Sequence, residues 1–156
     1  MPTTSFMGRH VRRREDPRLI TGSATYVDDI ALPSMAHMAI LRSPLPHARI
    51  LSIDTSAALE LPGVLAVVTG SDVAHLVPAR EAEASEQPAP PPRPPLATEK
   101  VRYIGDPVAA VVATDRAPAA DALESIVVAY EALPGVGDPE QAMEPGASQI
   151  LSLIHI

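Results

Sequence analysis

Five histidines and several carboxylates are the residues of this 156-residue chain that could carry chemistry, and their spacing fits few kinds of site. Imidazole nitrogens bind zinc, but the sequence contains no HExxH or HxH pair. His37 and His47 could approach one another on neighbouring strands, yet two imidazoles without a carboxylate or thiolate partner make a poor metal site. We therefore predict no metal ligand and expect surface or interface roles for the histidines, which are His10, His37, His47, His75 and His155.

The adjacent carboxylates Asp28 and Asp29 resemble an acid–base pair, which needs two environments that separate their pKa values. Adjacent side chains of an extended segment point to opposite sides, so we expect a turn or cap role instead. The same role is expected of the aspartates at strand ends and helix starts, which are Asp54, Asp106, Asp115 and Asp138. No Ser/His/Asp set can be assigned, because the sequence has no GxSxG elbow. We predict no catalytic residue.

The segment Thr69–Asp72 (TGSD) places a glycine before a short helix, whose N-terminus could hold an anion. We expect that Ser71 instead caps its own helix. There is no GxGxxG and no Walker-A sequence, so the usual nucleotide fingerprints are missing. The chain has no cysteine and therefore supplies no disulfide, thiolate ligand or thiol nucleophile. We predict no cofactor-binding residue.

The charge balance also excludes some partners. Twelve basic and nineteen acidic residues give a formal net charge of −7, whereas nucleic-acid binding needs a basic field. The one basic cluster, Arg9–Arg14, is short. We see no signal-peptide pattern, and apolar runs such as VAAVVA are far too short to span a membrane. We predict a cytoplasmic protein with no nucleic-acid or membrane partner.

The elements that must position these residues are short. Loose alternation predicts a strand over Met35–Ser43, and the segment ARILSIDTS predicts a second one. A helical turn capped by Ser56 follows, then a buried strand over Val64–Gly70 and a short helix over SDVAHL. Aromatic residues make up only 3% of the chain, so the core must consist of Val, Leu, Ile, Ala and Met.

The second half of the chain is also predicted to consist of short strands and helices. Val101 and Tyr103 begin a strand, and a turn at Gly105–Pro107 leads into a central strand over Val108–Ala113. A helix capped by Asp115 then runs into a strand within VVAYEAL. This order predicts an α+β domain, with a mixed sheet and short helices.

Composition suggests three regions. Residues 1–20 lack periodicity and are expected to form an extended N-terminal arm, followed by a folded domain over residues 21–134. Inside that domain the proline-rich segment 78–95 is expected to be an exposed loop, or alternatively a PxxP-type ligand. Residues 135–156 are expected to begin a downstream linker, and the final ILSLIHI to be a non-native tail.

Several motifs together are specific. They are the arm RREDPRLITG, the turn YVDD, the hairpin RSPLPHARI, the segment LPGVLAVVTGSD, and YIGDPVAAVVA leading into AADALESIVVAYEALP. In this order and spacing, Gly8 to Ala147 resembles the N-terminal α/β hammerhead domain of the molybdopterin-binding large subunit in the xanthine dehydrogenase, aldehyde oxidase and carbon-monoxide dehydrogenase family.

The resemblance implies an α/β hammerhead-like fold and a molybdenum hydroxylase that oxidises aldehydes, N-heterocycles or CO. It implies a molybdopterin cofactor of the cytosine dinucleotide type, together with flavin and 2Fe-2S partner subunits. The family's glycine-rich cofactor loops and catalytic glutamate lie downstream of its hammerhead domain and have no counterpart here. We therefore expect a structural domain that is inactive by itself, binds no cofactor and leaves an apolar face open. The alternative is a stand-alone interaction or assembly module.

Overall fold

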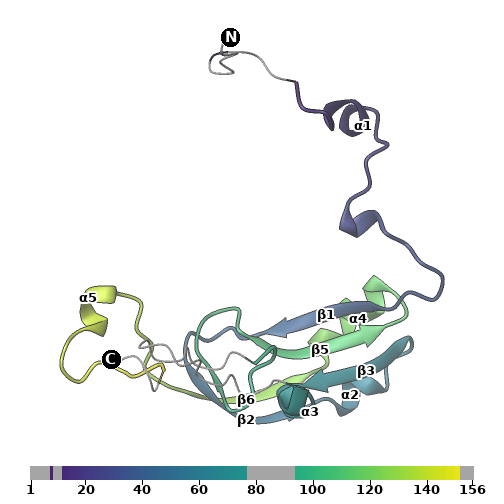
Figure 1. Ribbon diagram of the computed structural model, residues 1–156. Coiled ribbons are helices and arrows are strands. Elements are labelled where there is room, and N and C mark those ends of the chain that lie inside the picture. Colours follow the sequence, from purple (N-terminus) through teal and green to yellow (C-terminus); the bar gives the residue numbers. More distant parts are fainter. Residues whose placement is uncertain (1–7, 9–11, 77–93, 152–156) are drawn as a thin grey trace. The chain divides into compact units, whose positions relative to one another are not determined.

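The computed structural model describes residue 8 and residues 12–76 and 94–151 (Figure 1). The chain falls into two compact units, Met1–Met35 and Ala36–Ile156. Nearly all of the expected proline-rich loop and the last five residues of the expected tail lie outside the described residues.

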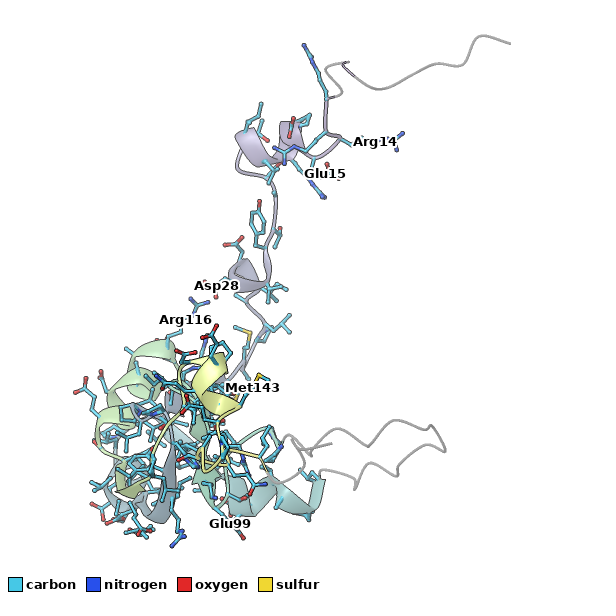
Figure 2. The ribbon with its side chains drawn as sticks, turned by 90° about the vertical axis from the view of Figure 1, so that its left-hand side faces the viewer. Arg14, Glu15, Asp28, Glu99, Arg116 and Met143 are labelled. Atoms are coloured by element: carbon cyan, nitrogen blue, oxygen red, sulfur yellow. The ribbon has the colours of Figure 1, made fainter. Side chains whose placement is uncertain are left out.

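The first unit contains a single turn of α-helix, α1 (Asp16–Ile20), and a 3₁₀ turn, η1 (Val27–Asp29). The helix lies within the segment that we expected to be extended, because Pro17 suits the first helical turn and Asp16 provides a negative charge there. Arg13 Nε lies 3.2 Å from Asp16 Oδ1, so one arginine of the basic cluster forms a local ion pair. Figure 2 shows Arg14 and Glu15 where α1 begins. Neither α1 nor η1 has a buried residue.

The second unit contains two three-stranded sheets. In the first sheet, β5 (Pro107–Ala113) lies between β1 (His37–Arg42) and β3 (Val64–Thr69). In the second sheet, β2 (Ala48–Asp54) lies between β4 (Lys100–Val101) and β6 (Val127–Ala132).

All these pairings are antiparallel, so the expected mixed sheet is replaced by two antiparallel ones, while the α+β class is confirmed. The central position of the strand after Pro107 is also confirmed. Tyr103 is not in a strand: its carbonyl accepts a hydrogen bond from Asp106 N at 3.1 Å, which closes a turn. Gly105 permits that turn, since its φ is +91°.

The helices of the second unit are short. They are α2 (Ser56–Leu59), α3 (Gly70–Val73), η2 (Ala74–Leu76), α4 (Arg116–Glu124) and α5 (Pro139–Ala142). Asp115 caps α4 as predicted, and α4 packs against β1 and β5 (Figure 1). Among the described residues, none of the helices has the length and apolar character needed to cross a lipid bilayer.

Two of the predicted caps are wrong. Ser56 is the first residue of α2, and both its N–H and its hydroxyl donate to Asp54 Oδ1, at 3.0 and 2.6 Å. Ser71 lies inside α3, whose N-cap residue is Thr69. Both errors have one cause. A threonine earlier in the chain, Thr55 for α2 and Thr69 for α3, takes the N-cap position that we assigned to the serine.

The core consists of two clusters, the first of which includes residues of α2 and α4. The first contains Ala58, Ala109, Val111, Ala122 and Ile126, and the second contains Ala48, Ala97, Val101 and Val108. Ile53 of β2 and Val128 of β6 pack against both, which joins the second sheet to the first. Small aliphatic side chains dominate these clusters, as the low aromatic content predicted.

Candidate functional site

The most elaborate polar arrangement is a corner where three connections meet, which we call the inter-sheet corner. It comprises residues 43–47 between β1 and β2, residues 102–106 before β5, and residues 133–135 after β6. Ser43 N donates to Asp106 O at 2.9 Å, and Gly105 N donates to Ser43 O at 2.8 Å. Arg42 Nη1 adds a 2.9 Å bond to Gly105 O. These bonds tie the exit of β1 to the entry of β5.

His47 lies inside this corner. It is 4% exposed, although we expected a surface or interface role, and its Nδ1 lies 2.8 Å from Pro134 O. Because a carbonyl oxygen only accepts hydrogen bonds, Nδ1 donates the hydrogen of this bond. The other ring nitrogen, Nε2, is buried and has no hydrogen-bond partner among the described residues. His47 O also accepts from Leu133 N at 2.9 Å, so the residue fastens the end of β6 to the start of β2.

Ser43 and Tyr130 complete the polar interior of the corner. Ser43, 2% exposed, donates its hydroxyl to Leu45 O at 2.9 Å and accepts from Leu45 N at 3.1 Å. Burial raises the pKa of Tyr130; a hydrogen bond with Ser43 opposes that rise, and the negative charge of Asp106 adds to it. The phenol therefore stays protonated at neutral pH. Ser43 and Tyr130 act here as structural hydrogen-bonding groups.

Most of the carboxylates named in the sequence analysis accept hydrogen bonds from backbone N–H groups, as expected of turn and cap residues. Each of the following accepts a hydrogen bond from a nearby main-chain N–H: Asp29, Asp54, Asp106, Asp115 and Asp138. Asp72 does the same at α3, where the N–H and the hydroxyl of Thr69 both donate to Oδ2 at 2.7 Å. Carboxylates held in this way define turns and helix starts rather than a reaction centre.

The two histidines that we considered as a pair are in different sheets. His37 begins β1 and lies opposite Ala113, whereas His47 precedes β2, which pairs only with β4 and β6. The two histidines therefore do not lie on neighbouring strands. In the part of the chain that the structure describes, no group of three or more His, Cys, Asp or Glu side chains could hold a metal ion.

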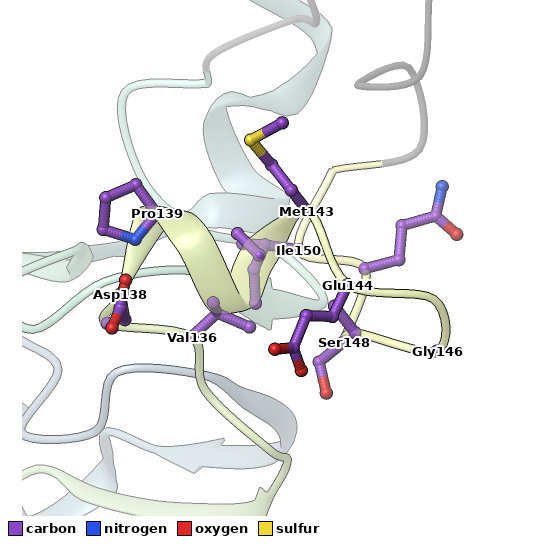
Figure 3. Close-up of a pocket in the computed structure, with 12 residues that line it drawn as sticks. Val136, Asp138, Pro139, Met143, Glu144, Gly146, Ser148 and Ile150 are labelled. Carbon is purple, nitrogen blue, oxygen red and sulfur yellow. The ribbon is translucent and has the colours of Figure 1, made fainter.

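A hollow lies outside the inter-sheet corner, in the segment after β6. Residues between Val136 and Ile150 line it, with α5 on one side (Figure 3). Asp138, one of its two carboxylates, is already bound to Glu140 N at 2.8 Å. Met143, which directly follows α5, is exposed (Figure 2). This hollow is formed by one local stretch of chain and brings together no set of groups suited to catalysis.

Comparison with known proteins agrees with the motifs that meet at the inter-sheet corner. Residues 21–134 match the family model described as aldehyde oxidase and xanthine dehydrogenase, a/b hammerhead domain. The chain belongs to this family.

Relatives within the family show what the chain is similar to. It is 44% identical over 144 residues to the 6-hydroxypseudooxynicotine dehydrogenase complex subunit gamma of Paenarthrobacter nicotinovorans, covering 89% of this chain and 18% of that one. Its fold matches quinoline 2-oxidoreductase from Pseudomonas putida 86 with a TM-score of 0.80 and 45% identity, over 91% of this chain and 18% of that one.

A third match is the Cu,Mo-CO dehydrogenase in its carbon-monoxide-reduced state. It has a TM-score of 0.77 and 44% identity, and the alignment covers 91% of this chain and 17% of that one. The hammerhead-like fold expected from the sequence is thereby confirmed. The hammerhead-family chain spans less than a fifth of the length of each of these relatives.

The described residues do not fit a molybdenum–pterin group. A pterin needs a cradle of polar groups, and the corner offers Ser43, which is already hydrogen-bonded, and the enclosed ring of His47. Gly70 has no side chain, which could leave space for a cofactor beside its backbone. The chain's own Ala97 carbonyl fills that space. No chemical step is therefore derived from this domain.

Sequence reasoning missed the importance of His47. The one local hint was in SPLPHARI, where His47 follows two prolines and precedes a strand, but it did not indicate which residues His47 contacts.

Proposed function

We propose that this chain is the N-terminal hammerhead part of the large subunit of a molybdenum-dependent oxidoreductase. The whole enzyme would hydroxylate aldehydes or N-heterocycles, or oxidise CO. The family match over residues 21–134 carries this proposal, and similarity to a Cu,Mo-CO dehydrogenase and to a quinoline 2-oxidoreductase supports it.

Within this proposal the domain is a scaffold and the reactive groups are elsewhere. The remainder of the subunit would hold a molybdopterin cofactor of the cytosine dinucleotide type, and flavin and 2Fe-2S subunits would carry electrons away. The name of one relative, a complex subunit gamma, is consistent with such an assembly. The engagement of the aspartates with backbone N–H groups supports the proposal that the domain alone is inactive.

We also propose that residues 1–20 are an arm that packs against the remainder of the subunit. Residues 21–134 would form the hammerhead domain and residue 135 would begin a linker. Ile20 of the arm is a strongly exposed apolar side chain, and so are Tyr26, Val27 and Leu32 in the rest of the first unit. Such side chains are typical of a segment that acquires a partner surface.

Metal analysis and a domain replacement test the proposal. The purified chain should contain no stoichiometric molybdenum and should not oxidise an aldehyde, a purine or CO. When it replaces the matching domain of the Cu,Mo-CO dehydrogenase large chain, the chimeric subunit should assemble and bind molybdenum. Molybdenum or turnover in the isolated chain contradicts the scaffold role. A chimera that fails to assemble, although the isolated chain is folded, favours a stand-alone module.

A further inference from the structure

On one face of the β1-β5-β3 sheet, two neighbouring rows of side chains are apolar, and we call these six residues the outer apolar patch. Two rows run across the three strands. Met38 lies opposite Val112, which lies opposite Ala66; Ile40 lies opposite Ala110, which lies opposite Val68. Because side chains alternate along a strand, these six residues share one face.

The opposite face of the same sheet packs into the first core cluster. Ala109 and Val111 belong to that cluster together with Ala122 of α4, and Leu41 and Val67 pack against it. On the patch side of β5, Val108 is buried in the second cluster and marks the end of the patch. The outer apolar patch therefore points away from that cluster and from α4. Its residues are correspondingly less covered: Met38 is 65% exposed, and all the others except Ala110 are partly exposed.

The second sheet shows what a water-facing surface looks like in this molecule. On β2 and β6, Arg49 Nη1 lies 3.1 Å from Glu131 Oε2 in an exposed ion pair. Ser52 and Asp54 are also exposed on β2. Antiparallel sheets that face water usually alternate polar and apolar residues in this way. The β1-β5-β3 sheet does not, so its outer face is not built to stay in water.

We infer that the outer apolar patch is the surface on which the remainder of the large subunit packs, through apolar side chains of its own. This inference rests on the proposed function. The comparison with relatives indicates which group of residues would cover the patch. The chain matches only 18% of the Paenarthrobacter nicotinovorans subunit, and the rest of that polypeptide lies outside the match. A patch of six apolar residues matches a permanent interface inside one polypeptide better than a transient one.

The test uses two side chains with similar exposure on different sheets. Met38 is 65% exposed in the patch, and Leu51 is 61% exposed on β2. Met38→Lys and Leu51→Lys are introduced into the chimeric CO dehydrogenase large chain and into the isolated chain. Met38→Leu serves as the conservative variant. Both isolated lysine variants should keep the wild-type circular dichroism spectrum and melting temperature, because both side chains face solvent.

In the chimera, Met38→Lys should lower the yield of assembled, molybdenum-containing subunit by about tenfold or more, because a lysine would be buried against apolar groups. Leu51→Lys and Met38→Leu should leave the yield within about twofold of the wild-type chimera. Size-exclusion chromatography with molybdenum analysis measures both.

Three other results overturn the inference. If the Met38→Lys chimera assembles like the Leu51→Lys chimera, the patch is not the docking face, and the proposed function stands because the parent chimera assembles. If the parent chimera itself fails although the isolated chain is folded, the proposed function fails as well. If the isolated chain is a dimer that Met38→Lys dissociates, the patch binds a second copy instead.

Discussion

His47 Nδ1 and the carbonyl oxygen of Pro134 lie 2.8 Å apart, although the two residues are far apart in the sequence. The bond joins the start of β2 to the segment that follows β6, and its donor is one of only two buried polar side chains among the described residues. The other ring nitrogen, Nε2, has no partner. The two nitrogens of this one side chain should therefore contribute differently to stability.

Replacing His47 by Asn or by Gln separates the two nitrogens. The Asn amide can take the position of Nδ1 and donate to Pro134 O, whereas the longer Gln amide reaches the position of Nε2. We expect His47→Asn to be more stable than His47→Gln by about 1 kcal/mol, the net value of one hydrogen bond. Urea unfolding of the isolated chain measures this difference. The reverse order would show that the position of Nε2 is the more important one.

The close approach at Gly70 gives a second prediction. A methyl group there would overlap the carbonyl of Ala97, so Gly70→Ala should force the backbones apart and destabilise the fold by about 1–3 kcal/mol. Gly137→Ala is the matched control, since no atom lies within 4 Å of its added methyl group. The control should change the unfolding free energy by less than about 1 kcal/mol. Equal losses in both variants would exclude the steric explanation.

The hydrogen bonds at the start of α3 should make the stability of the fold decrease at acidic pH. Hydrogen bonds from the Thr69 hydroxyl and the Thr69 N–H lower the pKa of Asp72. Because the folded pKa lies below the unfolded one, the ionised carboxylate stabilises the fold above about pH 4. That stabilisation is lost as the pH falls through the folded pKa. Thr69→Val removes the hydroxyl donor, so the pKa of Asp72 should rise towards its ordinary value in an NMR titration.

Ser56→Ala is the control for that experiment. The Ser56 hydroxyl and N–H lower the pKa of Asp54 in the same way, so Ser56→Ala should raise the pKa of Asp54 and leave that of Asp72 unchanged. If both carboxyls move in either variant, the shifts come from a general change in the fold.

The two aspartate caps should differ in importance. Asp115 Oδ1 accepts from Arg116 N at 2.6 Å and begins α4, which contributes two buried alanines to the core. Asp138 caps α5, which has no buried residue. We expect Asp115→Ala to cost about 1 kcal/mol in global unfolding and Asp138→Ala to cost less than about 0.5 kcal/mol. Thermal unfolding measures both, and equal effects would mean that α5 belongs to the cooperative core.

Local signals predicted the elements that depend on local chemistry. The strand over Val108–Ala113 is an uninterrupted apolar run after a glycine turn, and Asp115 directly precedes a helical pattern. Both were confirmed. The N-caps predicted at Ser56 and Ser71 were wrong by one and two residues. Several adjacent polar side chains could act as the N-cap, and the residue at which the preceding strand ends decides which of them does.

Non-local features could not be predicted in the same way. The burial of His47 depends on Leu133 and Pro134, and nothing in the flanking prolines indicates that contact. The division into two antiparallel sheets depends on which strands pair, and β1 skips β2, β3 and β4 to pair with β5. The absence of polar residues from the outer apolar patch became visible only when the register was known.

The position of β5 between β1 and β3 has a consequence for synthesis on the ribosome. Both outer strands leave the ribosome well before β5, and at about 5–20 residues per second they wait for seconds with unpaired edges. Exposed strand edges recruit other chains. A nascent polypeptide that stalls before Pro107 would therefore be prone to aggregation, whereas one that continues past Ala113 could complete the sheet.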